Sequence, residues 1–130
     1  MTFPFVRDAG TGLLIVSLTI INKFRFNMVL DTGATNTTID TNALHLYGYD
    51  FNECIGKVLI ETANGIVETE VYEIDNLCCL GIEKNRFPVQ VYDFLAHGIF
   101  SDYEGLLGLD FFEGTTFSID MKRNVITIEI

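Results

Sequence analysis

The sequence predicts an all-β domain with one or two short helices. Most of the chain consists of short runs of β-branched, aromatic and aliphatic residues that alternate with polar ones and end at turn residues. Only one stretch combines a helix start signal with a helix stop signal. The 130 residues are 48% apolar and include 11 Phe, which is enough for one buried core. We therefore expect a single domain over residues 1–130.

The first predicted element is a β-hairpin. Leu13–Ile20 is rich in strand-forming residues, and the turn at Asn22 and Lys23 separates it from Phe24–Leu30, whose apolar side chains alternate onto one face. The second strand ends at Asp31. This arrangement places a carboxylate at the end of an apolar strand, two residues before a glycine that permits a sharp turn.

A short helix is expected after this hairpin. Asp40 is placed as an N-cap before Thr41–Tyr47, and Gly48 is suited to the position after the helix. A second, longer hairpin is predicted from Lys57–Glu61 and Ile66–Ile74, joined by an Asn-Gly tip.

The later part of the chain predicts further strands. These are expected at Asn76–Leu80 and Phe87–Val91 with a turn over Glu83–Arg86, and at Gly105–Leu107 before a short helical segment. A terminal hairpin follows, with Phe117–Asp120, a turn over Met121–Asn124, and Val125–Ile130. We expect the last strand to be an exposed sheet edge unless another chain covers it.

Charge and composition exclude several classes of function. The net charge is −10, from 18 carboxylates against 8 Lys and Arg, which argues against nucleic acid or an anionic membrane as a partner and weakly favours basic or neutral peptides. The N-terminal residues predict neither a signal peptide nor a membrane span. Three cysteines, of which Cys78 and Cys79 are adjacent, fit reduced thiols in a cytoplasmic protein. No metal site is expected, because neither the cysteines nor the two histidines have ligand spacing.

The motifs, taken in order, resemble a known family. Leu30, Asp31, Thr32, Gly33 and Ala34, followed later in the chain by Gly105, Leu106, Leu107 and Gly108, resemble the retropepsin-like aspartic proteases, which include retroviral enzymes and bacterial relatives. The resemblance implies an acid-protease lobe built as a closed β-barrel. It covers about residues 10–130.

The resemblance also implies roles for individual residues. Asp31 would be the catalytic carboxylate, supported by an active-site loop of Thr32, Gly33 and Ala34 and, from beneath, by Leu106, Leu107 and Gly108. The hairpin tip would be a substrate-binding flap made of Thr62, Ala63, Asn64, Gly65 and Ile66, and the terminal hairpin would form the dimer sheet. An acidic residue after the first motif and an arginine after the second, which pair in retroviral relatives, are replaced here by Thr35-Asn36 and Leu109-Asp110.

Asp-Thr-Gly occurs once, although this chemistry needs two carboxylates that share a proton. We therefore expect a homodimeric aspartic endopeptidase that cleaves a peptide or protein substrate without a cofactor, using Asp31 from each of two chains. Asp31 is expected to be buried without a basic neighbour, and Asp110 and Glu113 are interpreted as carboxylates on a helix surface. The alternative function is a non-catalytic peptide-binding or oligomerisation module on the same fold.

Overall fold

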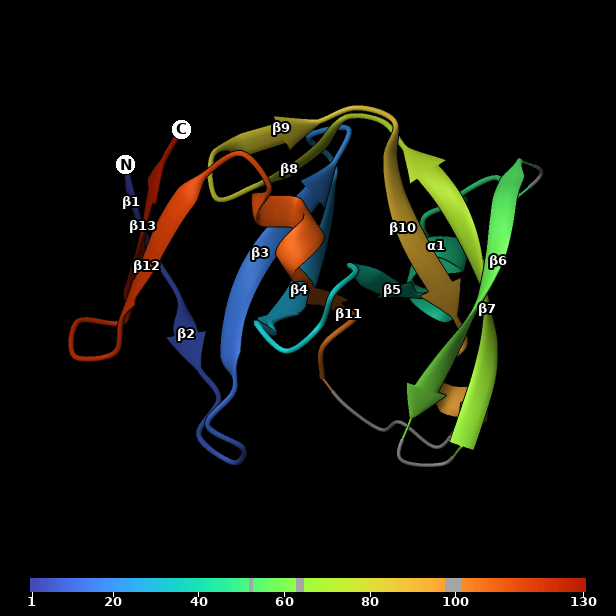
Figure 1. Cartoon of the computed structure of the whole chain (residues 1–130), viewed down its shortest axis with the longest axis horizontal. Helices are drawn as coiled ribbons and strands as arrows, with labels where there is room; N and C mark the ends of the chain where they lie inside the picture. The colour runs from blue at the N-terminus through green and yellow to red at the C-terminus, as the bar shows by residue number, and fades with distance from the viewer. Residues whose placement is uncertain (52, 63–64, 98–101) are drawn as a thin grey trace.

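The computed structural model describes residues 1–51, 53–62, 65–97 and 102–130, and its elements are predominantly β-strands (Figure 1). In chain order the strands are β1 (Thr2–Pro4), β2 (Val6–Arg7), β3 (Leu14–Ile20), β4 (Phe24–Leu30), β5 (Thr38–Asp40), β6 (Cys54–Thr62), β7 (Gly65–Ile74), β8 (Leu77–Cys79), β9 (Ile82–Lys84), β10 (Phe87–Tyr92), β11 (Gly105–Leu107), β12 (Thr116–Asp120) and β13 (Val125–Glu129). The helical segments are α1 (Thr41–Leu46) and two 3₁₀ turns, η1 (Leu95–His97) and η2 (Leu109–Phe112).

The strands form two sheets. The larger has ten strands in the order β6-β7-β10-β5-β11-β4-β3-β8-β9, with β2 added beside β3, and the smaller has the order β1-β13-β12. Two pairs, β10 with β5 and β11 with β4, are parallel, whereas the other pairs are antiparallel. Among the described strands no pairing joins β6 to β9, so the closed barrel that the resemblance implied is not found there, although the predominantly β architecture is confirmed.

Locally encoded elements agree with the sequence predictions. The first hairpin forms from β3 and β4, and its turn contains Ile21 and Asn22 with φ of 57° and 52°. α1 begins after Asp40, whose carboxylate accepts a hydrogen bond from the Asn42 N–H at 3.4 Å, and it ends before Gly48, which has φ of 76°. The terminal hairpin pairs β12 with β13 as expected.

The short strands are where the sequence predictions fail. β1, β2 and β5 were not expected, and the turn expected over Glu83–Arg86 is partly strand β9. Segments of two or three residues carry too little periodicity to be recognised, because their hydrogen bonds come from partners distant in sequence. β1, for example, pairs with β13 from the opposite end of the chain.

The pairing of β1 also corrects the expectation for the C-terminal strand. β13 is the central strand of the three-stranded sheet, and its Ile126 and Ile128 are 0% and 2% exposed. The edges of this sheet are β1 and β12, at the left of Figure 1. Of the two, β12 is the longer, and its Phe117 and Ile119 are only half-buried.

The main core lies where β3 and β4 pack against the remaining elements. Phe26 and Met28 of β4 and Leu18 of β3 are fully buried, and burial of one such side chain stabilises the fold by about 1.5–3 kcal/mol. Leu107 of β11 and Phe111 of η2 are likewise buried, and β11 pairs with the end of β4. This core positions the loop that follows β4.

Candidate active site

Asp31 lies immediately after β4, at the point where the chain leaves the sheet. Its backbone N–H donates to the Leu107 carbonyl at 3.1 Å, and its carbonyl accepts from the Ala34 N–H at 3.1 Å. The first bond extends the pairing of β4 with β11 by one residue, and the second closes a tight turn. The Asp31 backbone is therefore held on both sides, while its side chain is half-buried in the single chain rather than buried as expected.

Gly33 fixes the orientation of the Asp31 side chain. Its N–H donates to Asp31 Oδ1 at 2.9 Å, and a Cβ atom on Gly33 would lie 3.2 Å from the same oxygen. A glycine therefore allows the turn and the carboxylate to approach each other closely. Thr32 and Gly33 are exposed, and Ala34 is half-buried.

The second glycine motif lies directly beside this loop. β11 is inserted between β4 and β5, and beyond it the Leu109 N–H donates to the Ala34 carbonyl at 2.9 Å. Leu107 is fully buried and Leu106 is half-buried. A Cβ atom on Gly108 would lie 2.6 Å from the Asn36 carbonyl carbon, so the two loops are packed backbone against backbone.

Thr37 and Asp110 connect the two motifs, and sequence reasoning did not identify their role. The Thr37 hydroxyl donates to Asp110 Oδ1 at 2.7 Å, its N–H donates to the same oxygen at 2.9 Å, and its hydroxyl oxygen accepts from the Gly108 N–H at 3.1 Å. Asp110 thus lies on the helical turn η2 as expected, but it is half-buried and bonded to Thr37 rather than simply exposed, whereas Glu113 is exposed as expected. The only signal in the sequence was the absence of the acid and arginine that pair in retroviral relatives.

The hairpin expected to carry the flap is formed by β6 and β7, with Thr62 paired to Gly65 next to the tip. Ala63 and Asn64 lie outside the described residues. Gly65 has φ of 113°, which favours glycine, and Ile66 is 73% exposed. In Figure 1 β4 points toward the lower side of the molecule, and this end of the hairpin lies at that side.

The electrostatic surroundings of Asp31 contain no partner of opposite charge within the described part of the chain. The ion pairs there join Lys57 to Glu68, Arg86 to Glu73, and Arg123 to Asp120, and none of them involves Asp31. The same residues contain no group of three or more His, Cys, Asp or Glu side chains that could hold a metal ion. Asp31 is therefore a single accessible carboxylate on a loop whose backbone is hydrogen-bonded to Leu107 and Leu109.

Comparison with known families explains this arrangement. The sequence model of the aspartyl protease family matches residues 16–111, a range that includes both glycine motifs and the hairpin between them. The chain belongs to the aspartyl protease family. Its fold is of the retropepsin-like type, as the resemblance of its motifs predicted.

Solved structures agree with this assignment at the level of the fold. The crystal structure of a retropepsin-like aspartic protease from Rickettsia conorii superposes with a TM-score of 0.71 at 20% sequence identity, covering 98% of this chain and 90% of that one. No curated protein matches this aspartyl protease sequence significantly. Within the described residues, no helix is long and apolar enough to cross a membrane.

Proposed function

We propose that the chain is an aspartic endopeptidase whose active form is a homodimer, in which Asp31 and Asp31 of the partner subunit share one catalytic site. The observation that carries this proposal is a single carboxylate held by the Leu107, Ala34 and Gly33 hydrogen bonds and still accessible at the surface. Membership of the aspartyl protease family supports peptide hydrolysis, and that chemistry requires a second carboxylate.

The proposed reaction uses two carboxyl groups with different protonation states. Two carboxylates at hydrogen-bonding distance cannot both ionise easily, so one stays protonated and the other is charged. The ionised group removes a proton from water, which attacks the peptide carbonyl carbon, while the protonated group donates to the carbonyl oxygen. Collapse of the tetrahedral intermediate then breaks the C–N bond, with a proton passing to the leaving amine.

The remaining site residues would position these groups. Thr32, Gly33 and Ala34 would hold the loop, with the Thr32 hydroxyl directed to the partner subunit, and Leu106, Leu107 and Gly108 would support it from beneath. Thr62, Ala63, Asn64, Gly65 and Ile66 would act as the flap, pairing through their backbone groups with an extended peptide. We expect no metal or organic cofactor to take part.

The small sheet supplies a surface for the proposed dimer. β12 is an edge strand of five residues, whereas β1 has three and includes Pro4, which has no N–H to donate. Pairing of β12 with β12 of a second chain would extend the sheet and cover the half-buried Phe117 and Ile119. The acidic net charge disfavours nucleic acid as a partner, and the three free cysteines support a cytoplasmic location.

A peptide-library digest between pH 4 and pH 7 with the wild type and Asp31→Asn tests this proposal. We expect Asp31→Asn to lower kcat/KM by about 10³-fold, because it removes the general acid and base together. Glu83→Gln, which neutralises an exposed carboxylate on β9, is the matched control and should leave cleavage unchanged.

Mixing the wild type with Asp31→Asn tests whether two subunits share one catalytic site. Excess Asp31→Asn should suppress wild-type activity, because mixed dimers contain one catalytic carboxylate, and specific activity should fall on dilution. Cleavage that survives in Asp31→Asn would contradict the mechanism. Peptide binding without any Asp31-dependent cleavage would instead favour the peptide-binding module, and activity that resists both mixing and dilution would exclude the dimer.

A further inference from the structure

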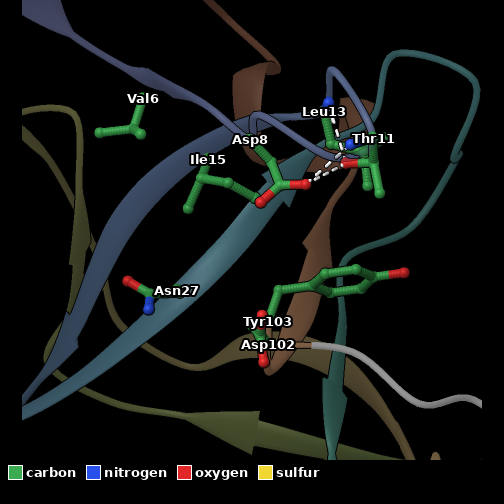
Figure 2. Close-up of a pocket in the computed structure, with 8 residues that line it drawn as sticks. All are labelled: Val6, Asp8, Thr11, Leu13, Ile15, Asn27, Asp102 and Tyr103. Atoms are coloured by element: carbon green, nitrogen blue, oxygen red, sulfur yellow. Dashed lines mark hydrogen bonds between the residues drawn. The ribbon is translucent and has the colours of Figure 1, made fainter.

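We propose that a cavity beside Asp31 binds a basic side chain, lysine or arginine, of the peptide substrate. The inference rests on the proposed endopeptidase function and adds a substrate class to it. The cavity has a volume of about 520 Å³, which is ample for one long side chain. Three segments distant in sequence form it: the β2–β3 connection, strand β4, and the residues directly before β11 (Figure 2).

The strand register places this cavity next to the candidate catalytic carboxylate. Ile15 of β3, which lines the cavity, is paired with Val29 of β4, two residues before Asp31, and Leu13, which precedes β3, also lines it. Asn27, at the other end of the cavity, lies on β4 four residues before Asp31. Because side chains on a strand alternate with a period of two, Asn27, Val29 and Asp31 project to the same side of the sheet.

The distances suit a substrate residue close to the scissile bond. Four strand residues span about 13 Å, so Asn27 lies about that far from Asp31 along β4, and Ile15, opposite Val29, lies at about half that distance. An extended peptide advances by about 3.3 Å per residue and turns alternate side chains to the same face. A side chain one to four residues from the scissile bond would therefore reach the cavity.

The walls of the cavity match a side chain with an apolar stem. Val6, Leu13 and Ile15 form the apolar part, and Val6 is 68% exposed, which leaves its side chain available for contact. Lysine and arginine pack their methylene groups on such surfaces while keeping the charged end among polar groups.

The polar lining matches the charged end. Asp8 and Asp102 approach the cavity from different segments, and Figure 2 shows Asp8 on one side and Asp102, with Asn27 and Tyr103, on the other. Among the described residues that line the cavity there is no Lys or Arg. Arg7 is not among the lining residues; its guanidinium lies beside Gly12, where an added Cβ would be 3.8 Å from Arg7 Nη2. A glutamate or aspartate of the substrate would meet two like charges here.

Asp8 is held in its position and in its ionised form. Its Oδ2 accepts hydrogen bonds from the Thr11 hydroxyl at 2.7 Å and the Thr11 N–H at 2.9 Å. These bonds lower the pKa of the Asp8 carboxyl below its ordinary value, so the charge persists into mildly acidic conditions. In Figure 2 the hydrogen bonds drawn from Thr11 reach one of the two carboxylate oxygens of Asp8.

The test compares matched peptides that carry lysine, norleucine or glutamate at one position, scanned over four residues on either side of the scissile bond. At the position that enters the cavity, we expect wild-type kcat/KM to be about three- to tenfold higher for lysine than for norleucine, and lowest for glutamate. Asp8→Asn and Asp102→Asn should each reduce the lysine preference, and Asp102→Lys should shift it toward glutamate. Asn at position 8 keeps an oxygen that can accept from Thr11, so the loop should remain folded.

The control and the binding assay separate this inference from the proposed function. Glu83→Gln should retain the wild-type preference. Fluorescence anisotropy measures binding without cleavage: the same peptides are labelled and titrated with the Asp31→Asn variant. The affinities for the lysine, norleucine and glutamate peptides then give the lysine preference in binding. If the wild type cleaves but the preference is absent, or is insensitive to Asp8 and Asp102, the cavity assignment is overturned while the protease function stands. If no peptide is cleaved, tighter binding of the lysine peptide that depends on Asp8 supports the cavity assignment alone. Equal binding of the three peptides, or no binding, overturns the cavity assignment.

Discussion

The Thr37 hydroxyl donates a hydrogen bond to Asp110 Oδ1 at 2.7 Å, although the two residues are 73 positions apart. Thr37 is fully buried and also accepts from the Gly108 N–H, so one side chain connects the segment after Asp31 to the segment after β11. Retroviral relatives were expected to make the corresponding connection with an ion pair. In this chain the two segments are joined by hydrogen bonds to a single carboxylate, which requires no buried basic side chain.

Removing the Thr37 hydroxyl should destabilise the domain. Thr37→Val keeps the shape but leaves the Gly108 N–H and one Asp110 oxygen without this partner, which we expect to lower the free energy of unfolding by about 1–3 kcal/mol. Thr37→Ser retains the hydroxyl and should lose less. Urea unfolding of both variants and of a double-mutant cycle with Asp110→Ala measures the effect. A coupling free energy near zero would show that the Thr37–Asp110 bond does not contribute.

Gly108 should not tolerate even an alanine. The added Cβ would lie 2.6 Å and 2.7 Å from the Asn36 carbonyl carbon and oxygen, which belong to the backbone and cannot move aside cheaply. We expect Gly108→Ala to cost about 1–3 kcal/mol of stability. Gly56→Ala is the control, because no atom lies within 4 Å of the added Cβ. Equal melting temperatures for the two variants would mean that the two loops are less tightly packed than the structure indicates.

Glu104 should make stability depend on pH. Burial raises the pKa of its carboxyl above the ordinary value of 4.5, and this outweighs the opposing effect of its hydrogen bond from the Asn27 N–H. A carboxyl with a raised pKa binds its proton more tightly in the folded state, so its contribution to the free energy of unfolding falls as pH rises from about 4.5 through the folded-state pKa.

Glu104→Gln should remove this dependence while keeping an oxygen for the Asn27 N–H. The variant is therefore expected to be more stable than the wild type at pH 7, with the advantage shrinking toward pH 3, where Glu104 is protonated in both states. Thermal melts between pH 3 and pH 7 measure the difference in stability between the wild type and Glu104→Gln. A stability difference that stays the same at every pH would show that Glu104 does not cause the pH dependence.

The parts of the fold that could be predicted from sequence are those that a few neighbouring residues specify. Alternation along Phe24–Leu30 and the turn at Asn22 determine the first hairpin, and Asp40 and Gly48 delimit the helix between them. The position of Asp31 at the end of an apolar strand, before a glycine, also follows from local sequence. These features depend on backbone propensity and side-chain period, which act within one element.

Only the tertiary structure decided which segments lie together. It placed β1 against β13, so that β12 rather than the C-terminal strand is an edge, and it joined Thr37 to Asp110. It also assembled the cavity from Asp8, Asn27 and Asp102, which have no shared pattern in the sequence. Such contacts depend on how separate elements pack around a common core, and the local preferences of each element contain no information about its distant neighbours.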